Sequence, residues 1–189
     1  EEFKETLFKL GETPLPKWVR EKVEPEDAER YQTIFASKEG AVAAPTAGMH
    51  FSKHLFKRME IKGIEKAFIT LHVGLGNFRT VDVEDLSKHK MDSEQFFVDE
   101  PTAETVNKTK REGHKIVSIG TTVMRTLETA VSTGGMIKPM EGWTNKFIFA
   151  PYEFSVADAM VTNFQLPYST QLMMVSAFGG YDLIMNAYK

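Results

Sequence analysis

The chain has 189 residues, enough to bury a substantial core, and its 42% hydrophobic and 26% charged residues are typical of an ordinary globular protein rather than a disordered one. It contains no cysteine, which excludes disulfides, thiolate catalysis and cysteine-ligated metal centres. The formal charge of −3 provides no overall attraction to nucleic acid, although a local basic surface is compatible with it.

No stretch of the sequence has the pattern of a membrane or targeting segment. The apolar runs are all shorter than the roughly 20 residues that a membrane-spanning helix needs. The first residues, EEFKETLFKLGE, are acidic and amphipathic rather than signal-like. We therefore expect a cytoplasmic protein with no membrane partner.

The first 40 residues have the pattern of a lead-in to the rest of the chain. Apolar residues at helical spacing predict a helix over 2–10, which Gly11 ends. Two prolines then favour extended backbone and leave Trp18 and Val19 to anchor the segment. Because the helix begins at the very start, we expect the chain to be part of a longer protein. We predict a single α/β domain over 1–189, with a lead-in over 1–40 and a core over 41–189.

Residues 41–78 contain two loops of small residues on either side of one amphipathic helix. The first loop, Pro45-Thr46-Ala47-Gly48, lets a ligand approach its backbone closely. Ser52 is the expected N-cap of a helix with a basic exposed side, which ends at Gly63. A strand over 66–73 then leads to the second loop, 74–78.

The second half of the chain repeats the alternation of strands and helices. A helix beginning at Pro101 and a strand over 116–119 precede Gly120, after which Thr121 or Thr122 is the expected N-cap of another helix. Further along, we predict a strand over 146–150 and a helix over 169–178, while 156–164 fits either a strand or a helix. This alternation predicts an α/β layered sandwich with a mostly parallel sheet flanked by helices.

The helix start at Gly120-Thr121-Thr122 is the strongest candidate for an anion site. Free backbone N–H groups and the helix dipole favour phosphate or carboxylate there, and Arg125 lies one turn further on. An ordinary threonine cap and a surface salt bridge explain the same residues equally well. The HVGLGNF stretch is only a fragment of a dinucleotide fingerprint, since its third glycine is absent.

Several polar residues are candidates for proton transfer or base recognition. His50 and His54 have helical i,i+4 spacing and His72 ends the predicted strand, but no carboxylate completes a metal site, so we expect no metal. Asp92 and Glu94 offer two carboxylates, although a solvated turn is their simplest interpretation. The amide and aromatic groups of 163–167 suit contact with a nucleobase, and a turn before a proline is the alternative.

Six motifs occur in one order along the chain: APTAGMHF, ITLHVGLGNF, KMDSE, GTTVMRTLE, VTNFQLP and MMVSAFGGYDLIMNAYK. Together they resemble the bacterial S-adenosylmethionine:tRNA ribosyltransferase-isomerases of queuosine biosynthesis. The resemblance implies transfer and isomerisation of the ribosyl part of S-adenosylmethionine onto an aminomethyl-deazaguanine base at the tRNA wobble position. The implied products are epoxyqueuosine-containing tRNA, adenine and methionine. It also implies an opening segment, an inserted β-barrel and a tail beyond this α/β domain, so we expect the isolated chain to be weakly active or inactive.

The candidate residues fall into two groups under this resemblance. The expected cosubstrate is S-adenosylmethionine, the expected partner is tRNA, and the expected state is a monomer. The candidates for proton removal are His50, His72, Asp92 and Glu94. The candidates for substrate binding are Pro45, Thr46, Ala47, Gly48, Phe51, Gly74, Gly76, Phe78, Gly120, Thr121, Thr122, Arg125, Asn163 and Phe164. Two other classes stay open: a module that binds nucleotide or tRNA without catalysis, and a metal-dependent hydrolase using His50, His54 and His72.

Overall fold

The fold is described by a computed structural model that covers residues 2–16, 19 and 22–189, without the side chains of residues 77 and 78. The α-helices are α1 (Glu2–Leu10), α2 (Asp27–Arg30), α3 (Lys53–Ile61), α4 (Glu100–Arg111), α5 (Thr121–Ala130), α6 (Thr170–Gly179) and α7 (Tyr181–Ala187). The strands are β1 (Thr70–Leu71), β2 (Glu94–Val98), β3 (Val117–Ile119), β4 (Met140–Thr144) and β5 (Ala159–Val161). The described residues also form the 3-10 turns η1 (Thr46–His50), η2 (Leu75–Phe78) and η3 (Leu86–Lys88).

The strands form two small sheets rather than one. The larger sheet has the order β1-β2-β4 and is antiparallel throughout, with Leu71 opposite Phe96 and Phe96 opposite Gly142. Among the strands of the described residues, β3 and β5 alone pair in parallel. The α/β class is therefore right, but the prediction of a mostly parallel sheet is wrong. A parallel pairing needs a crossover, usually a helix, whereas β1 returns to β2 through a segment whose only helical turns are η2 and η3.

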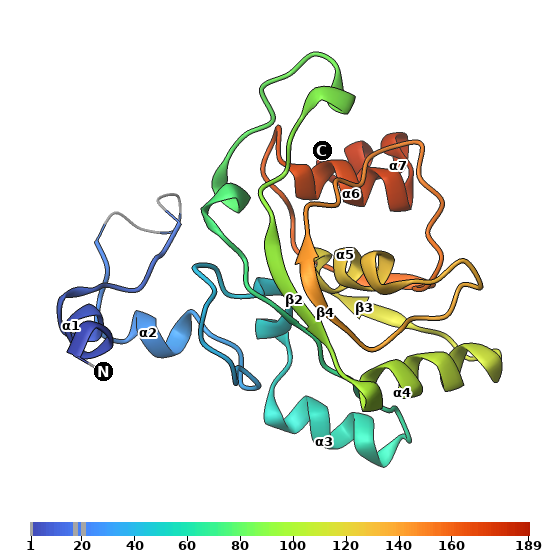
Figure 1. The fold of residues 1–189 in the computed structure, drawn as a ribbon, viewed down its shortest axis with the longest axis horizontal. Coiled ribbons are helices and arrows are strands. Elements are labelled where there is room, and N and C mark those ends of the chain that lie inside the picture. The colour runs from blue at the N-terminus through green and yellow to red at the C-terminus, as the bar shows by residue number, and fades with distance from the viewer. Residues whose placement is uncertain (1, 17–18, 20–21) are drawn as a thin grey trace.

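Helix α5 lies at the centre of the fold, against the antiparallel sheet on one side and α6 on the other (Figure 1). Burial alternates along β2, so Phe96 points toward α5 and is fully buried. Met124 and Leu127 of α5 and Met174 of α6 pack in the same core cluster. The helix that carries the Thr121-Thr122 start is therefore held rigidly by the hydrophobic core.

The helix boundaries follow local signals in the sequence. The helix expected over 2–10 is confirmed as α1. Ser52 caps α3, its hydroxyl accepting from the backbone N–H of Leu55 at 3.1 Å, and Ser169 caps α6 through Leu172 at 3.1 Å. Gly63 adopts a left-handed φ of +70° just after α3. The Ser52 cap could be predicted from the sequence because a cap depends on residues within one turn.

The strands were harder to predict. Of the strand expected over 66–73, only Thr70–Leu71 forms a strand, β1. Residues 146–150 form no strand, while the polar stretch Met140–Thr144 forms β4 along the whole of β2. Strand formation depends on a partner from elsewhere in the chain, which local β-propensity does not reveal. Residues 159–161, where the pattern left the choice open, form β5.

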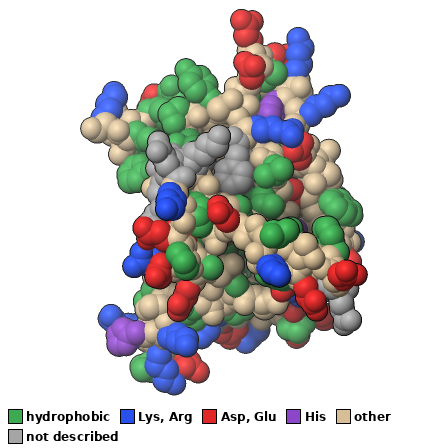
Figure 2. Space-filling view, turned by 90° about the vertical axis from the view of Figure 1, so that its left-hand side faces the viewer, with side chains coloured by type: hydrophobic (Ala, Val, Ile, Leu, Met, Phe, Trp, Pro, Cys, Tyr) green, Lys and Arg blue, Asp and Glu red, His purple; other side chains and the backbone are tan. Residues whose placement is uncertain are grey.

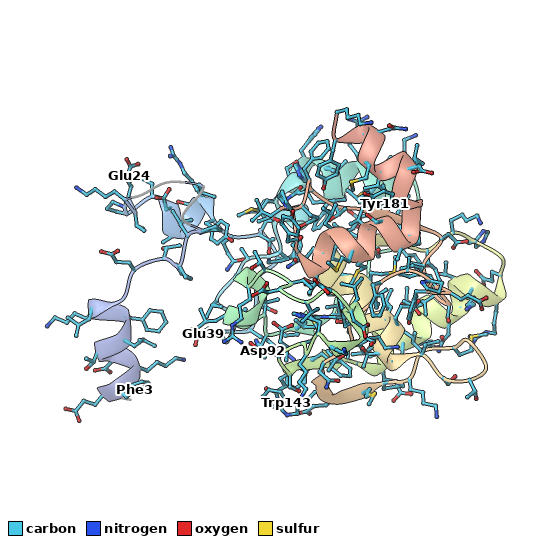
Figure 3. All side chains as sticks on the ribbon, turned by 90° about the horizontal axis from the view of Figure 1, so that it is seen from above. Phe3, Glu24, Glu39, Asp92, Trp143 and Tyr181 are labelled. Carbon is cyan, nitrogen blue, oxygen red and sulfur yellow. The ribbon has the colours of Figure 1, made fainter. Side chains whose placement is uncertain are left out.

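The lead-in extends away from the core. Figure 3 shows Phe3 on a helix that stands apart from the rest of the chain, and Phe3, Leu7 and Phe8 are all exposed. The expected anchor Val19 is exposed as well, while Trp18 lies outside the described residues. The buried hydrophobic residues of the described chain run from Ala43 to Val175.

Helix α3 presents its basic side to solvent. Lys53, His54, Lys57 and Arg58 are exposed. Figure 2 shows lysine, arginine and histidine side chains gathered at the lower edge of the molecule. Within the described residues, none of the helices has the length and apolar character that crossing a bilayer requires.

Candidate functional site

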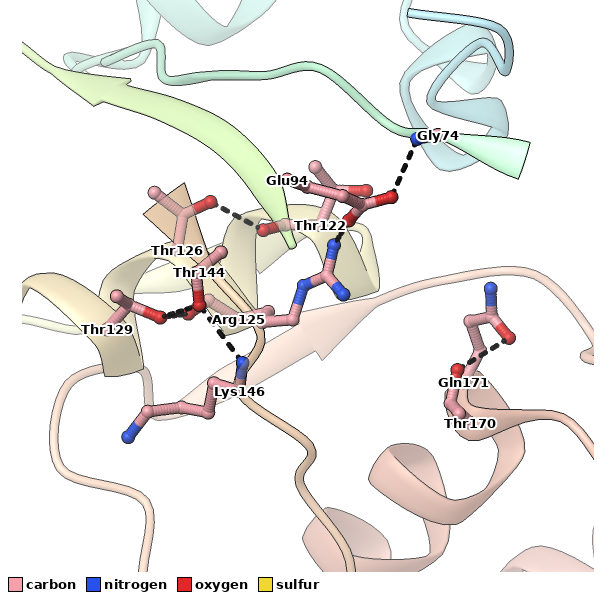
Figure 4. Close-up of polar contacts among 10 residues, drawn as sticks. All are labelled: Gly74, Glu94, Thr122, Arg125, Thr126, Thr129, Thr144, Lys146, Thr170 and Gln171. Carbon is pink, nitrogen blue, oxygen red and sulfur yellow. Dashed lines mark hydrogen bonds and ion pairs between the residues drawn. The ribbon is translucent and has the colours of Figure 1, made fainter. Parts of the chain in front are cut away.

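A buried ion pair between β2 and α5 lies at the base of the candidate site. Glu94 and Arg125 are only 4% and 7% exposed, and the Glu94 carboxylate pairs with the Arg125 guanidinium (Figure 4). The other carboxylate oxygen accepts a hydrogen bond from the backbone N–H of Gly74 at 2.7 Å. Burial lowers the pKa of Arg125 to about 10, so the guanidinium stays charged at neutral pH. The ion pair therefore joins the second small-residue loop to the central helix.

This geometry changes the interpretation of both residues. Arg125 was a candidate clamp for a ligand anion and Glu94 a candidate base, but each is engaged by the other. A buried charge whose partner is removed becomes strongly unfavourable. In the folded chain the pair therefore links β2 to α5 next to the cleft.

The first small-residue loop lies beside the start of α5. Ala47 and Gly48 are buried in η1, and a Cβ atom placed on Gly120 would lie 3.6 Å from the Cβ of Ala47. Gly48 has no room for a side chain, because an added Cβ would approach the ring of Phe35 to 2.6 Å. Pro45 and Thr46 are exposed at the entry to the same turn. The loop thus provides a backbone wall next to the helix start.

The side chains of His50, at the end of this loop, and Asn163, in the loop after β5, are in contact. The His50 Nε2 atom lies 2.6 Å from the Asn163 Oδ1 atom, although 113 residues separate them. Backbone pairing brings them together, since the Gly120 N–H donates to Val161 at the end of β5 at 2.8 Å. If Nε2–H donates to the amide oxygen, the Nδ1 atom has a free lone pair and can accept a proton.

His72 lies on the other face of the antiparallel sheet. Its backbone N–H donates to Gln95, so its side chain is on the face of Phe97, opposite to that of Glu94 and Phe96. The imidazole packs edge-on against the Phe97 ring at 5.8 Å. It also leaves no space for a Cβ atom on Gly40. The structure therefore separates His72 from Glu94 and Arg125.

The remaining candidates divide between the site and its surroundings. Asp92 is exposed and pairs with Arg79 at 3.3 Å, and it packs so closely on Gly76 that a Cβ atom there would clash. Phe51 packs against Phe56 in a separate aromatic cluster. Phe164 is 76% exposed and meets Tyr188 edge-to-face. The side chain of Phe78 lies outside the described residues.

A narrow cleft opens at the start of α5. Its water-accessible space is about 20 Å³, roughly the room needed by one water molecule, so a nucleoside would have to move side chains at its rim. The lining residues are Met91, Thr121, Thr122, Arg125, Lys146, Phe147, Ile148, Thr170, Gln171 and Met174. Thr121, Thr122 and Arg125 were expected from the sequence, whereas the other residues were not. The only signal for Lys146 was a single charge just before an apolar run.

The cap of α5 differs from the expectation. Gly120, not Thr121 or Thr122, is the N-cap, with φ +97° and ψ 153°, and no side chain accepts a hydrogen bond from the first turn. Only glycine adopts this backbone conformation readily. Thr121 and Thr122 are thus the first two residues of the helix, and both line the cleft.

Replacing Gly120 by alanine is expected to lower the free energy of unfolding by about 1–3 kcal/mol, because a Cβ atom is strained at this φ and ψ. Urea unfolding followed by circular dichroism measures the change. Gly134→Ala is the matched control, since no atom lies within 4 Å of its added Cβ and its φ is not in the left-handed region. Equal effects of the two substitutions would refute the strain argument.

Among the described residues, no group of three or more histidine, aspartate or glutamate side chains is arranged to hold a metal ion. His50 and His72, two members of the histidine set that suggested a hydrolase, make separate contacts: His50 with Asn163, and His72 with Phe97.

The fold and the cleft together define a class of protein. They describe an α/β domain with a cleft where a strand passes into the N-terminus of a helix, the place where many nucleotide- and cofactor-binding domains hold their ligand. The family model described as queuosine biosynthesis protein matches residues 1–189, and the chain belongs to this family.

Curated relatives and a solved structure agree with this assignment. An S-adenosylmethionine:tRNA ribosyltransferase-isomerase from Phocaeicola vulgatus is 65% identical over 188 residues, covering 100% of this chain and 54% of that protein. The protein of the same name from Flavobacterium psychrophilum is 58% identical, with the same coverage. The crystal structure of the S-adenosylmethionine tRNA ribosyltransferase from Thermotoga maritima aligns with a TM-score of 0.59 and 38% identity, over 75% of this chain and 44% of that one. The chain thus spans about half the length of the curated relatives it matches.

Proposed function

We propose that this chain forms part of an enzyme that transfers and isomerises the ribosyl moiety of S-adenosylmethionine onto the aminomethyl-deazaguanine base at the tRNA wobble position. Epoxyqueuosine-containing tRNA, adenine and methionine are the products. The observation that carries the proposal is the 65% identity, along the whole chain, to a protein named for this activity. The reaction takes place in the cytoplasm, where tRNA is modified.

The cleft at the start of α5 is the proposed site for S-adenosylmethionine. Thr121 and Thr122 provide hydroxyl groups and free backbone N–H groups, to which a carboxylate can bind. Met91 and Phe147 provide apolar surface for the rest of the molecule. The proposal is supported by the rigid placement of α5 in the core, because a fixed site loses little entropy on binding.

His50 is the proposed general base. A sulfonium centre makes the neighbouring C–H bonds more acidic, and the reaction needs a group that removes such a proton. His50 is exposed at the end of the loop whose Ala47 lies next to Gly120, and its contact with Asn163 orients the ring. The alternatives are less well placed, since Glu94 is paired, Asp92 is paired and His72 lies on the other face of the sheet.

A direct test is the release of adenine by the full-length protein. We expect adenine and methionine to appear when S-adenosylmethionine is combined with tRNA carrying the aminomethyl-deazaguanine base, together with the matching mass increase of the tRNA base. Unmodified tRNA serves as the control and should give no product. Binding of both substrates without adenine release would instead indicate a binding module, and residues 1–189 alone should turn over weakly or not at all.

A further inference from the structure

The exposed side of α3 carries a cluster of positive charges that lies outside the cleft. Its members are all exposed and belong to α3 or its C-cap: Lys53, Lys57, Arg58 and Lys62. We call these four residues the basic face of α3. Glu60 is the single acidic residue of this stretch, so residues 53–62 have a net charge of +3, whereas the whole chain has −3. Positive charge is therefore concentrated on one helix of an acidic protein.

Most of this charge is not neutralised by neighbouring side chains. Lys57 pairs with Glu60 at 3.0 Å. Within the ranges that the structure describes, no acidic side chain lies within ion-pair distance of Lys53, Arg58 or Lys62. These three cations can therefore form charge-assisted hydrogen bonds with an anionic partner.

The packed side of α3 fixes the helix to the loop that carries His50. Phe56, a half-buried residue of the helix, stacks on Phe35 with 5.9 Å between the ring centres, and its ring lies 6.0 Å from that of Phe51. Phe51 follows His50 directly, and Ser52 then caps the helix. Nine residues of α-helix extend about 13 Å. The basic face therefore begins three residues after the proposed base and extends over only a short distance.

We propose that the basic face of α3 binds the phosphate backbone of the tRNA substrate. The inference rests on the proposed function and adds to it the surface that holds the tRNA. Exposed lysines and arginines bind nucleic acid mainly through phosphate oxygens, which position the molecule without reading its sequence. The tRNA base reacts at the site that contains His50, so phosphates near that base pass close to the start of α3.

A polyanion fits this surface better than a single small anion. The four charges are spread along an exposed helix side and do not converge on one point. Several phosphates in a row match such an arrangement, because each cation can bind a different phosphate.

Binding of tRNA to the full-length protein, measured by filter binding between about 50 and 200 mM salt, tests the inference. The triple variant Lys53→Gln, Arg58→Gln and Lys62→Gln should bind tRNA about 10- to 100-fold more weakly, and the slope of log affinity against log salt should become shallower by about 2 to 3. Both effects should be equal for the substrate tRNA and an unrelated tRNA, because phosphates carry no sequence information. Glutamine has a helix propensity close to that of lysine and arginine, so α3 should persist.

A second variant changes the charge in the opposite direction. Glu60→Gln removes the acidic residue of α3 and frees Lys57, so tRNA binding should become about 2- to 5-fold tighter. Lys138→Gln is the control for net charge, because it removes an exposed lysine from another part of the chain, and it should leave tRNA binding unchanged. In turnover assays the triple variant should raise the KM for tRNA and leave the KM for S-adenosylmethionine unchanged.

The outcomes separate this inference from the proposed function. If the unaltered protein binds tRNA and releases adenine, but the triple variant binds tRNA with the same affinity and salt slope, the inference is refuted and the proposed function stands. An equal loss per removed charge in Lys138→Gln would also refute it, since net charge alone would then explain the effect. If the unaltered protein neither binds tRNA nor releases adenine, the proposed function fails, and the inference fails with it. Thermal unfolding of each variant checks that it is folded.

Discussion

Replacing Arg125 by methionine is expected to lower the free energy of unfolding by about 3–5 kcal/mol, which is a large part of the stability of a domain of this size. The substitution keeps most of the apolar volume but leaves the Glu94 carboxylate buried without its cation. Glu94→Gln should also destabilise the protein, because it leaves the guanidinium unpaired while retaining an oxygen for Gly74. Urea unfolding monitored by circular dichroism and tryptophan fluorescence gives the free energies.

A double-mutant cycle isolates the ion pair from other losses. The variant Glu94→Gln with Arg125→Met removes both charges, so its destabilisation should be smaller than the sum of the two single effects. Arg79→Met is the matched control, because Arg79 pairs with Asp92 at the surface and should change stability by less than about 1 kcal/mol. Additive single effects would show that the buried pair contributes no coupling and would contradict its assigned role.

His50→Ala is expected to lower the turnover of the full-length protein about 10²- to 10⁴-fold, the usual contribution of a positioned general base. The side chain is exposed and its hydrogen bond is to one amide group, so the fold should be retained. The rate of adenine release at saturating S-adenosylmethionine and tRNA measures the effect.

Two other histidines serve as controls for His50. His54 lies one turn further along on the exposed side of α3, so His54→Ala should leave turnover unchanged. His72→Ala removes a ring that packs on Phe97 and should affect stability more than turnover. If His72→Ala instead abolished turnover while His50→Ala did not, the assignment of the base to the loop beside α5 would be wrong.

The candidate site shows which parts of a site can be predicted from one sequence. Small-residue loops and the helix start at Gly120 could be recognised because glycine and threonine have strong local preferences. The role of Arg125 could not be predicted, since its partner Glu94 comes from another strand and both side chains are buried. His50 and His72 have similar local surroundings, and only sheet pairing places His72 on the opposite face. The hydrogen bonds that link Glu128, Tyr152 and Lys146 could not be predicted from the sequence, because each joins distant or irregular segments.

The family, the α/β class, the Ser52 cap of α3 and the two loops of small residues could all be predicted from the sequence, because motifs, caps and turns depend on residues that are close in the chain. The tertiary structure alone decided the antiparallel order β1-β2-β4, the burial of Glu94 with Arg125, the contact of His50 with Asn163 and the setting of Lys146. Those features depend on which distant segments pack together. Strand pairing and buried ion pairs need partners from elsewhere in the chain, so they are decided only when the whole chain folds.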